Sequence, residues 1–179
     1  MTDHQILYIH GFASRVDANH PKYAALTKLG EVSAIAPDYE RGRPYVEQLI
    51  HQTINTRGTT LLVGTSMGGW LAARAASQHG IPFVALNPCL QPHITLAQLG
   101  GSTAGQRRAR QIASYDDFSL DAKGLVIVEL GDALLDSRDT AQRLADHYPV
   151  IMLEGGSHQF EQLDLMVSHV ATFLHTPNS

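Results

Sequence analysis

The stretch T-T-L-L-V-G-T-S-M-G-G, residues 59–69, decides how this chain folds. An apolar run typical of a strand passes directly into G-x-S-x-G, and an alanine-rich stretch typical of a helix follows. Such a strand-to-helix turn is so tight that the residues two positions either side of the serine must lack bulk. The pattern predicts that Ser66 is exposed above a sheet, with the Met67 amide pointing into the same space. The alternative is a glycine-rich turn needed only for close helix–sheet packing.

A phosphate-binding loop is the other motif expected at a glycine-rich turn between a strand and a helix. That loop requires a lysine followed by serine or threonine after its second glycine. Here Gly68 is followed by Gly69 and Trp70. The sequence therefore does not predict a nucleotide-phosphate site, which counts against a flavodoxin-like nucleotide binder.

Outward from this turn, short apolar runs alternate with stretches of helical periodicity. The runs are nearly continuous in apolar residues, as expected of strands that are covered on both faces. Strand–helix alternation predicts an α/β domain with a mostly parallel sheet of about six strands and helices on both faces. Ligands of such sheets bind beyond the carboxyl ends of the strands. The expected strands are residues 6–9, 32–36, 59–64, 83–86, 125–130 and 150–153. The expected helices cover about 44–56, a stretch from about 66, and the stripe Phe160, Leu163, Val167, Val170 and Leu174.

Residues 91–123 interrupt this alternation. Gly100 and Gly101 precede a short polar stretch with helical character at 106–110. We interpret the segment as a small lid-like insertion over the site; a surface excursion without a role is the alternative. The sequence has no repeat and no low-complexity linker, so residues 1–179 are expected to form one domain.

A serine nucleophile needs a base, and His158 is the histidine placed to provide it. The predicted last strand ends in E-G-G-S-H, residues 154–158, where the glycines allow a sharp turn. This puts the imidazole at the carboxyl edge of the sheet just before the last helix, as in hydrolases with the chain order Ser, acid, His. A histidine that merely starts a helix is the alternative. His10 is interpreted as a structural residue, and the other eight histidines as surface or helix-face residues.

The acid that orients the imidazole should follow the strand between the serine and the histidine. Two residues are candidates there. Asp132 leaves the run 125–130 after one glycine, whereas Asp136 precedes a helical stretch and has the context of an N-cap. We prefer Asp132 and keep Asp136 as second choice.

The oxyanion formed on an attacked carbonyl needs N–H donors. One is the amide of Met67. The other should come from the loop after the first strand, where Gly11 permits a turn and Phe12 presents its amide. Gly11, Phe12 and Met67 are accordingly the predicted substrate-binding residues.

Together these motifs resemble a serine hydrolase of the α/β-hydrolase superfamily, and most of all the small bacterial YqiA-type esterases. The matching segments are I-L-Y-I-H-G-F at 6–12, G-T-S-M-G-G at 64–69, N-P at 87–88, G-D-A-L-L-D at 131–136 and E-G-G-S-H at 154–158. The resemblance implies a cytosolic esterase with carboxyl esters or acyl-CoA thioesters as substrates.

Composition narrows the function classes further. The chain has 13 Lys+Arg against 17 Asp+Glu, so no basic surface for nucleic acid is expected. Its single cysteine, Cys89, excludes an internal disulfide framework and an all-thiolate metal site. The N-terminus has no basic region of a signal peptide, and no run of 18 apolar residues suits a membrane span, so a cytoplasmic protein is expected.

The sequence thus predicts a serine esterase that cleaves small-molecule esters or thioesters through an acyl-enzyme intermediate, with Ser66, His158 and Asp132 as its triad. No cofactor and no metal are expected. An amidase or peptidase-type acyl hydrolase on the same triad, and a non-catalytic hydrolase-like binding protein, are the alternatives.

Overall fold

The computed structural model describes residues 4–99 and 106–176. Its strands form one six-stranded sheet in the order β2-β1-β3-β4-β5-β6, and all neighbouring pairs are parallel. The predicted α/β class with a mostly parallel sheet is confirmed, and the sheet is in fact parallel throughout. The strands are β1 (His4–Ile9), β2 (Gly30–Ile35), β3 (Leu61–Thr65), β4 (Phe83–Leu86), β5 (Gly124–Glu129) and β6 (Val150–Leu153).

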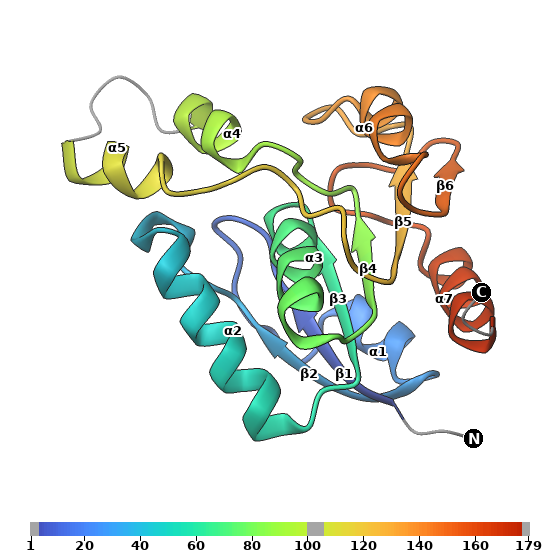
Figure 1. Ribbon diagram of the computed structural model, residues 1–179. Coiled ribbons are helices and arrows are strands. Elements are labelled where there is room, and N and C mark those ends of the chain that lie inside the picture. The colour runs from blue at the N-terminus through green and yellow to red at the C-terminus, as the bar shows by residue number, and fades with distance from the viewer. Residues whose placement is uncertain (1–3, 100–105, 177–179) are drawn as a thin grey trace.

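Helices connect the strands (Figure 1). They are α1 (Pro21–Leu26), the short 3-10 helix η1 (Tyr39–Arg41), α2 (Arg43–Arg57), α3 (Met67–His79), α4 (Pro92–Leu99), α5 (Gln106–Ile112), α6 (Ser137–Leu144) and α7 (Leu163–His175). The sequence did not predict α1 or α4. It also placed Phe160 on the last helix, but Phe160 precedes α7, has a φ of 66° and is buried in the core.

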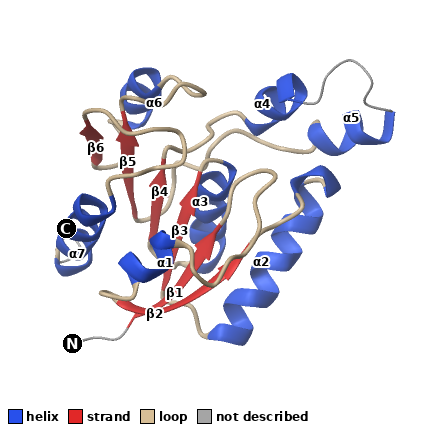
Figure 2. Ribbon diagram, turned by 180° about the vertical axis from the view of Figure 1, so that it is seen from behind, coloured by secondary structure: helices blue, strands red, loops and turns tan. Residues whose placement is uncertain are grey.

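Helices lie on both faces of the sheet (Figure 2), and buried apolar residues form one layer on each face. The α2, α3 and α6 helices pack on one face, where Leu62 and Val126 point, while α1 and α7 pack on the other, where Leu61 and Leu125 point. Successive residues of each central strand are therefore buried on opposite faces. This explains why the strands are continuous apolar runs rather than alternating ones.

The strand order brings the expected site loops to one edge of the sheet. The β1 strand pairs with β3, and β3, β4, β5 and β6 follow in sequence. Because all six strands are parallel, the loops that leave β1, β3, β5 and β6 at their carboxyl ends emerge at the same edge. These are the loops that carry the residues predicted to act in catalysis.

Candidate active site

Ser66 occupies a strained turn between β3 and α3. Its φ of 56° and ψ of −119° lie in a region that a residue with a side chain rarely adopts. Main-chain bonds hold it there: its N–H donates to the Leu86 carbonyl at 3.0 Å, and its carbonyl accepts from the amides of Gly69 at 3.0 Å and Trp70 at 3.2 Å. Strain of this kind persists only when the surroundings impose it, and it is common at functional sites.

The two glycines of G-x-S-x-G are required by close backbone contacts. A Cβ at Gly64 would lie 2.1 Å from the Gly68 carbonyl oxygen, and a Cβ at Gly68 would lie 2.0 Å from that of Ile9. Close packing, the alternative interpretation of this motif, is thus a genuine requirement. It does not explain why a serine occupies the strained position between the two glycines.

Ser66, His158 and Asp132 form one chain of hydrogen bonds. The Nε2 atom of His158 lies 3.0 Å from Ser66 Oγ, and its Nδ1 atom lies 2.8 Å from Asp132 Oδ2. A carboxylate only accepts, so Nδ1–H donates to Asp132 and Nε2 is left to accept from the serine hydroxyl. The carboxylate of Asp132 is 0% exposed, whereas the imidazole is 23% exposed. The arrangement has a nucleophile, a base and an orienting acid in hydrogen-bond reach of one another.

Hydrogen bonds keep Asp132 ionised. Burial alone would raise the pKa of this carboxyl, but the bonds from His158 and from the amides of Leu135 and Leu134 outweigh it and lower the pKa. Both amides donate to Oδ1, at 2.9 and 2.7 Å. The carboxylate is thus fixed at one oxygen by the main chain and presents the other to His158.

Asp136, the second choice for the acid, caps α6. Its Oδ1 accepts from the amides of Arg138 and Asp139, both at 3.0 Å. This is the N-cap geometry expected from its sequence context. The structure brings Asp132 and not Asp136 to His158; the catalytic role of Asp132 stays a prediction.

A cavity of about 310 Å³ opens above Ser66. Gly11, Phe12 and Met67 line it together with Ser66 and His158. A Cβ on Gly11 would lie 3.3 Å from Ser66 Cβ, so the loop after β1 passes directly beside the nucleophile. Met67 is the first residue of α3, and an amide there has no acceptor within its own helix. Phe12 and Met67 thus both line the cavity that holds Ser66, and the role of their amides in an oxyanion hole stays a prediction.

Sequence reasoning missed several side chains that line this cavity. His20 and Lys22 come from the start of α1, which was not predicted, and Leu134 comes from the loop after Asp132. The sequence predicts His20 as a surface or helix-face residue; in the structure it lines the cavity and accepts the Lys22 amide through Nδ1 as the N-cap of α1. The one available signal was Pro21, which is typical of the first turn of a helix.

His10 braces the loop that carries Phe12. Its Nε2 atom is hydrogen-bonded to the Tyr23 hydroxyl, and its carbonyl accepts from the Tyr39 hydroxyl at 2.7 Å. Burial, aided by the nearby charges of His20 and Lys22, lowers the pKa of His10 to about 4. His10 is thus a neutral structural residue at physiological pH.

This depressed pKa predicts acid sensitivity of the fold. The ordinary pKa is 6.5, so between about pH 6.5 and pH 4 the unfolded chain binds a proton at His10 that the folded chain does not. The contribution of neutral His10 to the free energy of unfolding is fully present above pH 6.5. It decreases as the pH falls through this range, by at most about 3 kcal/mol. We expect the variant His10→Gln to weaken the pH dependence of the free energy of unfolding between pH 4 and 6.5. Urea titrations at several pH values measure it; an unchanged pH dependence would contradict the assignment.

The structure describes only part of the segment 91–123, which the sequence predicts as a lid. Gly100 and Gly101 lie outside the described residues. On the described part, Thr95 of α4 lines the cavity. The segment's contacts to the rest of the fold include hydrogen bonds from the Trp70 indole to the Asp116 carbonyl at 3.0 Å and from the Tyr115 hydroxyl to the Tyr39 carbonyl at 2.7 Å. A lid function stays a prediction.

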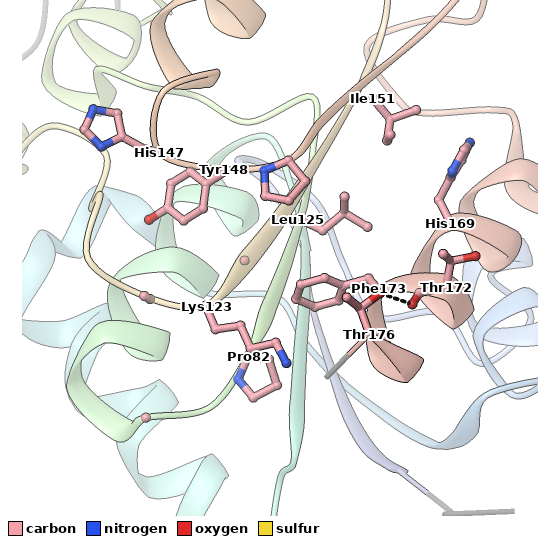
Figure 3. A pocket seen from close by; sticks show the side chains of 14 residues that line it. Pro82, Lys123, Leu125, His147, Tyr148, Ile151, His169, Thr172, Phe173 and Thr176 are labelled. Atoms are coloured by element: carbon pink, nitrogen blue, oxygen red, sulfur yellow. Dashed lines mark hydrogen bonds between the residues drawn. The ribbon is translucent and has the colours of Figure 1, made fainter. Parts of the chain in front are cut away.

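A larger cavity, of about 790 Å³, lies at the opposite edge of the sheet (Figure 3). It is bounded by the amino ends of β5 and β6 and by α7, with Leu125, Ile151 and Phe173 among its lining side chains. None of the predicted site residues lines it.

Within 4–99 and 106–176, no three or more His, Cys, Asp or Glu side chains are grouped so that they could hold a metal ion. None of the helices in these two ranges is long and apolar enough to cross a bilayer.

Comparison with known proteins places the chain in a family. Residues 5–175 match UPF0227, described as an uncharacterised protein family. A UPF0227 protein of Vibrio parahaemolyticus is 29% identical over 183 residues, covering 96% of this chain and 99% of the relative. One of Vibrio cholerae is 27% identical over 176 residues, covering 88% of this chain and 92% of the relative.

Solved structures show the same fold at low sequence identity. Est1E from Butyrivibrio proteoclasticus superposes with a TM-score of 0.71 at 17% identity, over 94% of this chain and 86% of that chain. A monoacylglycerol lipase of Paleococcus ferrophilus gives a TM-score of 0.64 at 14% identity, over 94% of both chains. A fluorophosphonate-binding serine hydrolase of Staphylococcus aureus gives 0.63 at 16% identity, over 96% of this chain and 83% of that chain. The resemblance inferred from the motifs is confirmed: the chain belongs to the UPF0227 family and has the α/β-hydrolase fold.

Proposed function

We propose that this protein is a serine hydrolase that transfers the acyl group of a carboxyl ester or thioester to water. The observation that carries the proposal is the hydrogen-bonded chain from Ser66 through His158 to Asp132, with distances of 3.0 and 2.8 Å, of which Ser66 and His158 line a cavity. The strained turn at Ser66 supports it, because a strained turn raises the hydroxyl above the sheet. Esterases and a lipase among the proteins of similar fold are consistent with this chemistry.

The first half of the reaction acylates the serine. Ser66 Oγ attacks the carbonyl carbon while His158 Nε2 takes the hydroxyl proton, and Asp132 stabilises the imidazolium that results. The negative charge moves to the carbonyl oxygen, where the amides of Met67 and Phe12 stabilise it. The intermediate collapses, the bond to the alcohol or thiol breaks, and the imidazolium returns its proton to the leaving group.

The second half releases the acid. A water molecule attacks the acyl-enzyme while His158 takes its proton, and a second oxyanion forms at the same amides. Collapse of this intermediate breaks the bond to Ser66, which recovers its proton from the imidazolium. The cycle consumes one ester and one water, releases one acid and one alcohol or thiol, and needs no cofactor.

A fluorophosphonate probe tests the proposal, because it reacts with an activated serine and not with an ordinary one. We expect stoichiometric labelling of Ser66, and hydrolysis of p-nitrophenyl esters and acyl thioesters assayed over a graded series of chain lengths. Matched amides of the same acyl groups separate an esterase from an amidase or peptidase. The absence of both labelling and turnover would favour a non-catalytic binding protein.

The triad predicts a specific pH dependence. His158 must be neutral to accept the serine proton, so kcat/KM should fall as the pH is lowered. The pKa of Asp132 is below its usual range, so this carboxylate should not add a second proton to the acid limb. We expect a slope of about one in log kcat/KM against pH on the acid side, measured between about pH 5 and 9.

The matched control for this profile is the same assay in EDTA. Turnover by the triad is expected to be unchanged by the chelator. A flat profile, or a loss of activity with EDTA, would instead indicate other chemistry such as attack by a metal-bound hydroxide.

A further inference from the structure

Glu129 is a fully buried carboxylate whose role the proposed mechanism does not explain. It is the last residue of β5, three residues before Asp132, and it is 0% exposed. Its oxygens accept the amides of Ser157 at 2.8 Å, Glu161 at 3.0 Å and Gln162 at 2.7 Å. These donors stand on both sides of His158, one residue before it and three and four residues after it.

His158 lies in the loop between β6 and α7, and Gly156 in this loop makes room for the Glu129 carboxylate. A Cβ at Gly156 would lie 2.1 Å from the Glu129 carboxylate, and Gly156 itself has a φ of 73°. The sequence predicted this glycine as a means of turning the chain. Its contact with Glu129 supplies a second and independent requirement.

Asn87 holds the same loop from the end of β4. Its side chain is buried and donates through Nδ2 to the carbonyls of Ser157, at 2.9 Å, and His158, at 3.4 Å. Its Oδ1 accepts the Glu129 amide at 2.7 Å. One asparagine thus ties the main chain of the loop to the main chain of β5.

Lys22 approaches from the α1 side. Its buried ammonium donates to the Gln159 carbonyl, one residue after His158. Burial lowers the pKa of Lys22 to about 8, and the negative charge of Glu129 partly offsets this effect. The loop is therefore held by a carboxylate, an amide and an ammonium that come from three different elements.

Core packing alone does not account for an acid at this position. A buried carboxylate must be fully hydrogen-bonded to be tolerated, and replacing buried ionic groups by apolar ones of similar volume is often neutral or stabilising. The Glu129 carboxylate provides acceptors for amides on both sides of His158, which an apolar side chain would not provide. From this geometry we infer that Glu129 is the positioning residue for His158, which it holds in reach of Ser66 and Asp132 at once.

The inference rests on the proposed function, since it assigns to Glu129 the task of placing the catalytic base. The test is the variant Glu129→Gln, which keeps the shape but turns an –NH₂ group toward amides that need an acceptor. We expect kcat to fall by about 10- to 100-fold, because a shift of roughly 1 Å in a catalytic group has that cost. KM should change little, since Glu129 does not line the cavity.

A spectroscopic measurement separates positioning from a purely structural role. The Nδ1–H proton of His158, bonded to Asp132, should give a far-downfield resonance in the proton NMR spectrum that is absent from the variant His158→Ala. We expect Glu129→Gln to shift or broaden this resonance well below its melting temperature, while Glu129→Asp, which keeps the charge, recovers part of both kcat and the signal. The signal needs no substrate, so it tests the inference even if Ser66→Ala shows that the proposed function is wrong.

Glu47→Gln is the matched control. Glu47 is a partly buried carboxylate of α2 that is hydrogen-bonded to Arg74, and it does not line the cavity. Its amide variant should lower the melting temperature without changing kcat or the His158 resonance. Wild-type kcat and an unchanged resonance in Glu129→Gln would overturn the inference, whatever its melting temperature; if that variant does not fold, the same two measurements on Glu129→Asp decide.

Discussion

Replacing Ser66 by alanine should reduce ester hydrolysis by several powers of ten, on the order of 10⁴- to 10⁶-fold in kcat, and leave the fold intact. The variant loses the only atom of Ser66 that bonds to His158, namely Oγ. Alanine keeps the Cβ and the main-chain bonds that hold the turn, so the strained conformation is no more costly than before. Turnover of a p-nitrophenyl ester by protein of unchanged circular dichroism and melting temperature measures the effect.

Cys89→Ala is the control for this prediction, because Cys89 carries a thiol and its main chain contacts the turn. Its amide donates to the Ser66 carbonyl at 3.1 Å, but its thiol is buried, and burial raises the thiol pKa. A buried thiol of raised pKa is a poor nucleophile. We expect Cys89→Ala to retain nearly full kcat. Near-wild-type turnover in Ser66→Ala, or a large loss in folded Cys89→Ala, would refute the serine mechanism.

The fold was predictable because its central strands are buried on both faces. Three of the six expected runs match the observed strands to within one residue at each end, and the runs at 83–86 and 150–153 coincide with β4 and β6. The helices α1 and α4 were missed for a physical reason. They have six and eight residues, and helices this short owe their stability to tertiary packing rather than to a pattern of their own.

The candidate site could likewise be predicted from the sequence only in part. Ser66, Asp132 and His158 could be predicted to lie together because each stands in the loop or turn after a recognisable strand, and parallel strands end at one edge of the sheet. Glu129 could not be found by this reasoning. It interrupts the apolar run of β5, and its partners are backbone amides 28 to 33 residues further along the chain, which carry no signature in the sequence.

Asp132→Asn is expected to fold and to lose up to roughly 10⁴-fold in kcat. The asparagine oxygen can still accept the amides of Leu134 and Leu135, which preserves the turn after β5. Its –NH₂ group then faces His158 Nδ1 and donates to it, so the ring proton moves to Nε2. An Nε2–H directed at Ser66 cannot accept the serine proton, and the hydroxyl is no longer activated. Measuring kcat below the melting temperature isolates this loss from any change in stability.

Asp136→Asn carries the same chemical change four residues away and should keep nearly full kcat. Asparagine caps a helix about as well as aspartate, so the bonds to the amides of Arg138 and Asp139 can be retained, and the lost charge costs at most about 1 kcal/mol at a helix start. Asp136→Ala removes the cap and should cost about 0.5–2 kcal/mol of stability, again without a large effect on kcat. The two asparagine variants thus separate the acid that orients an imidazole from the acid that caps a helix. An inactive Asp136→Asn beside an active Asp132→Asn would reverse the assignment and mean that the bond between Asp132 and His158 does not act in turnover.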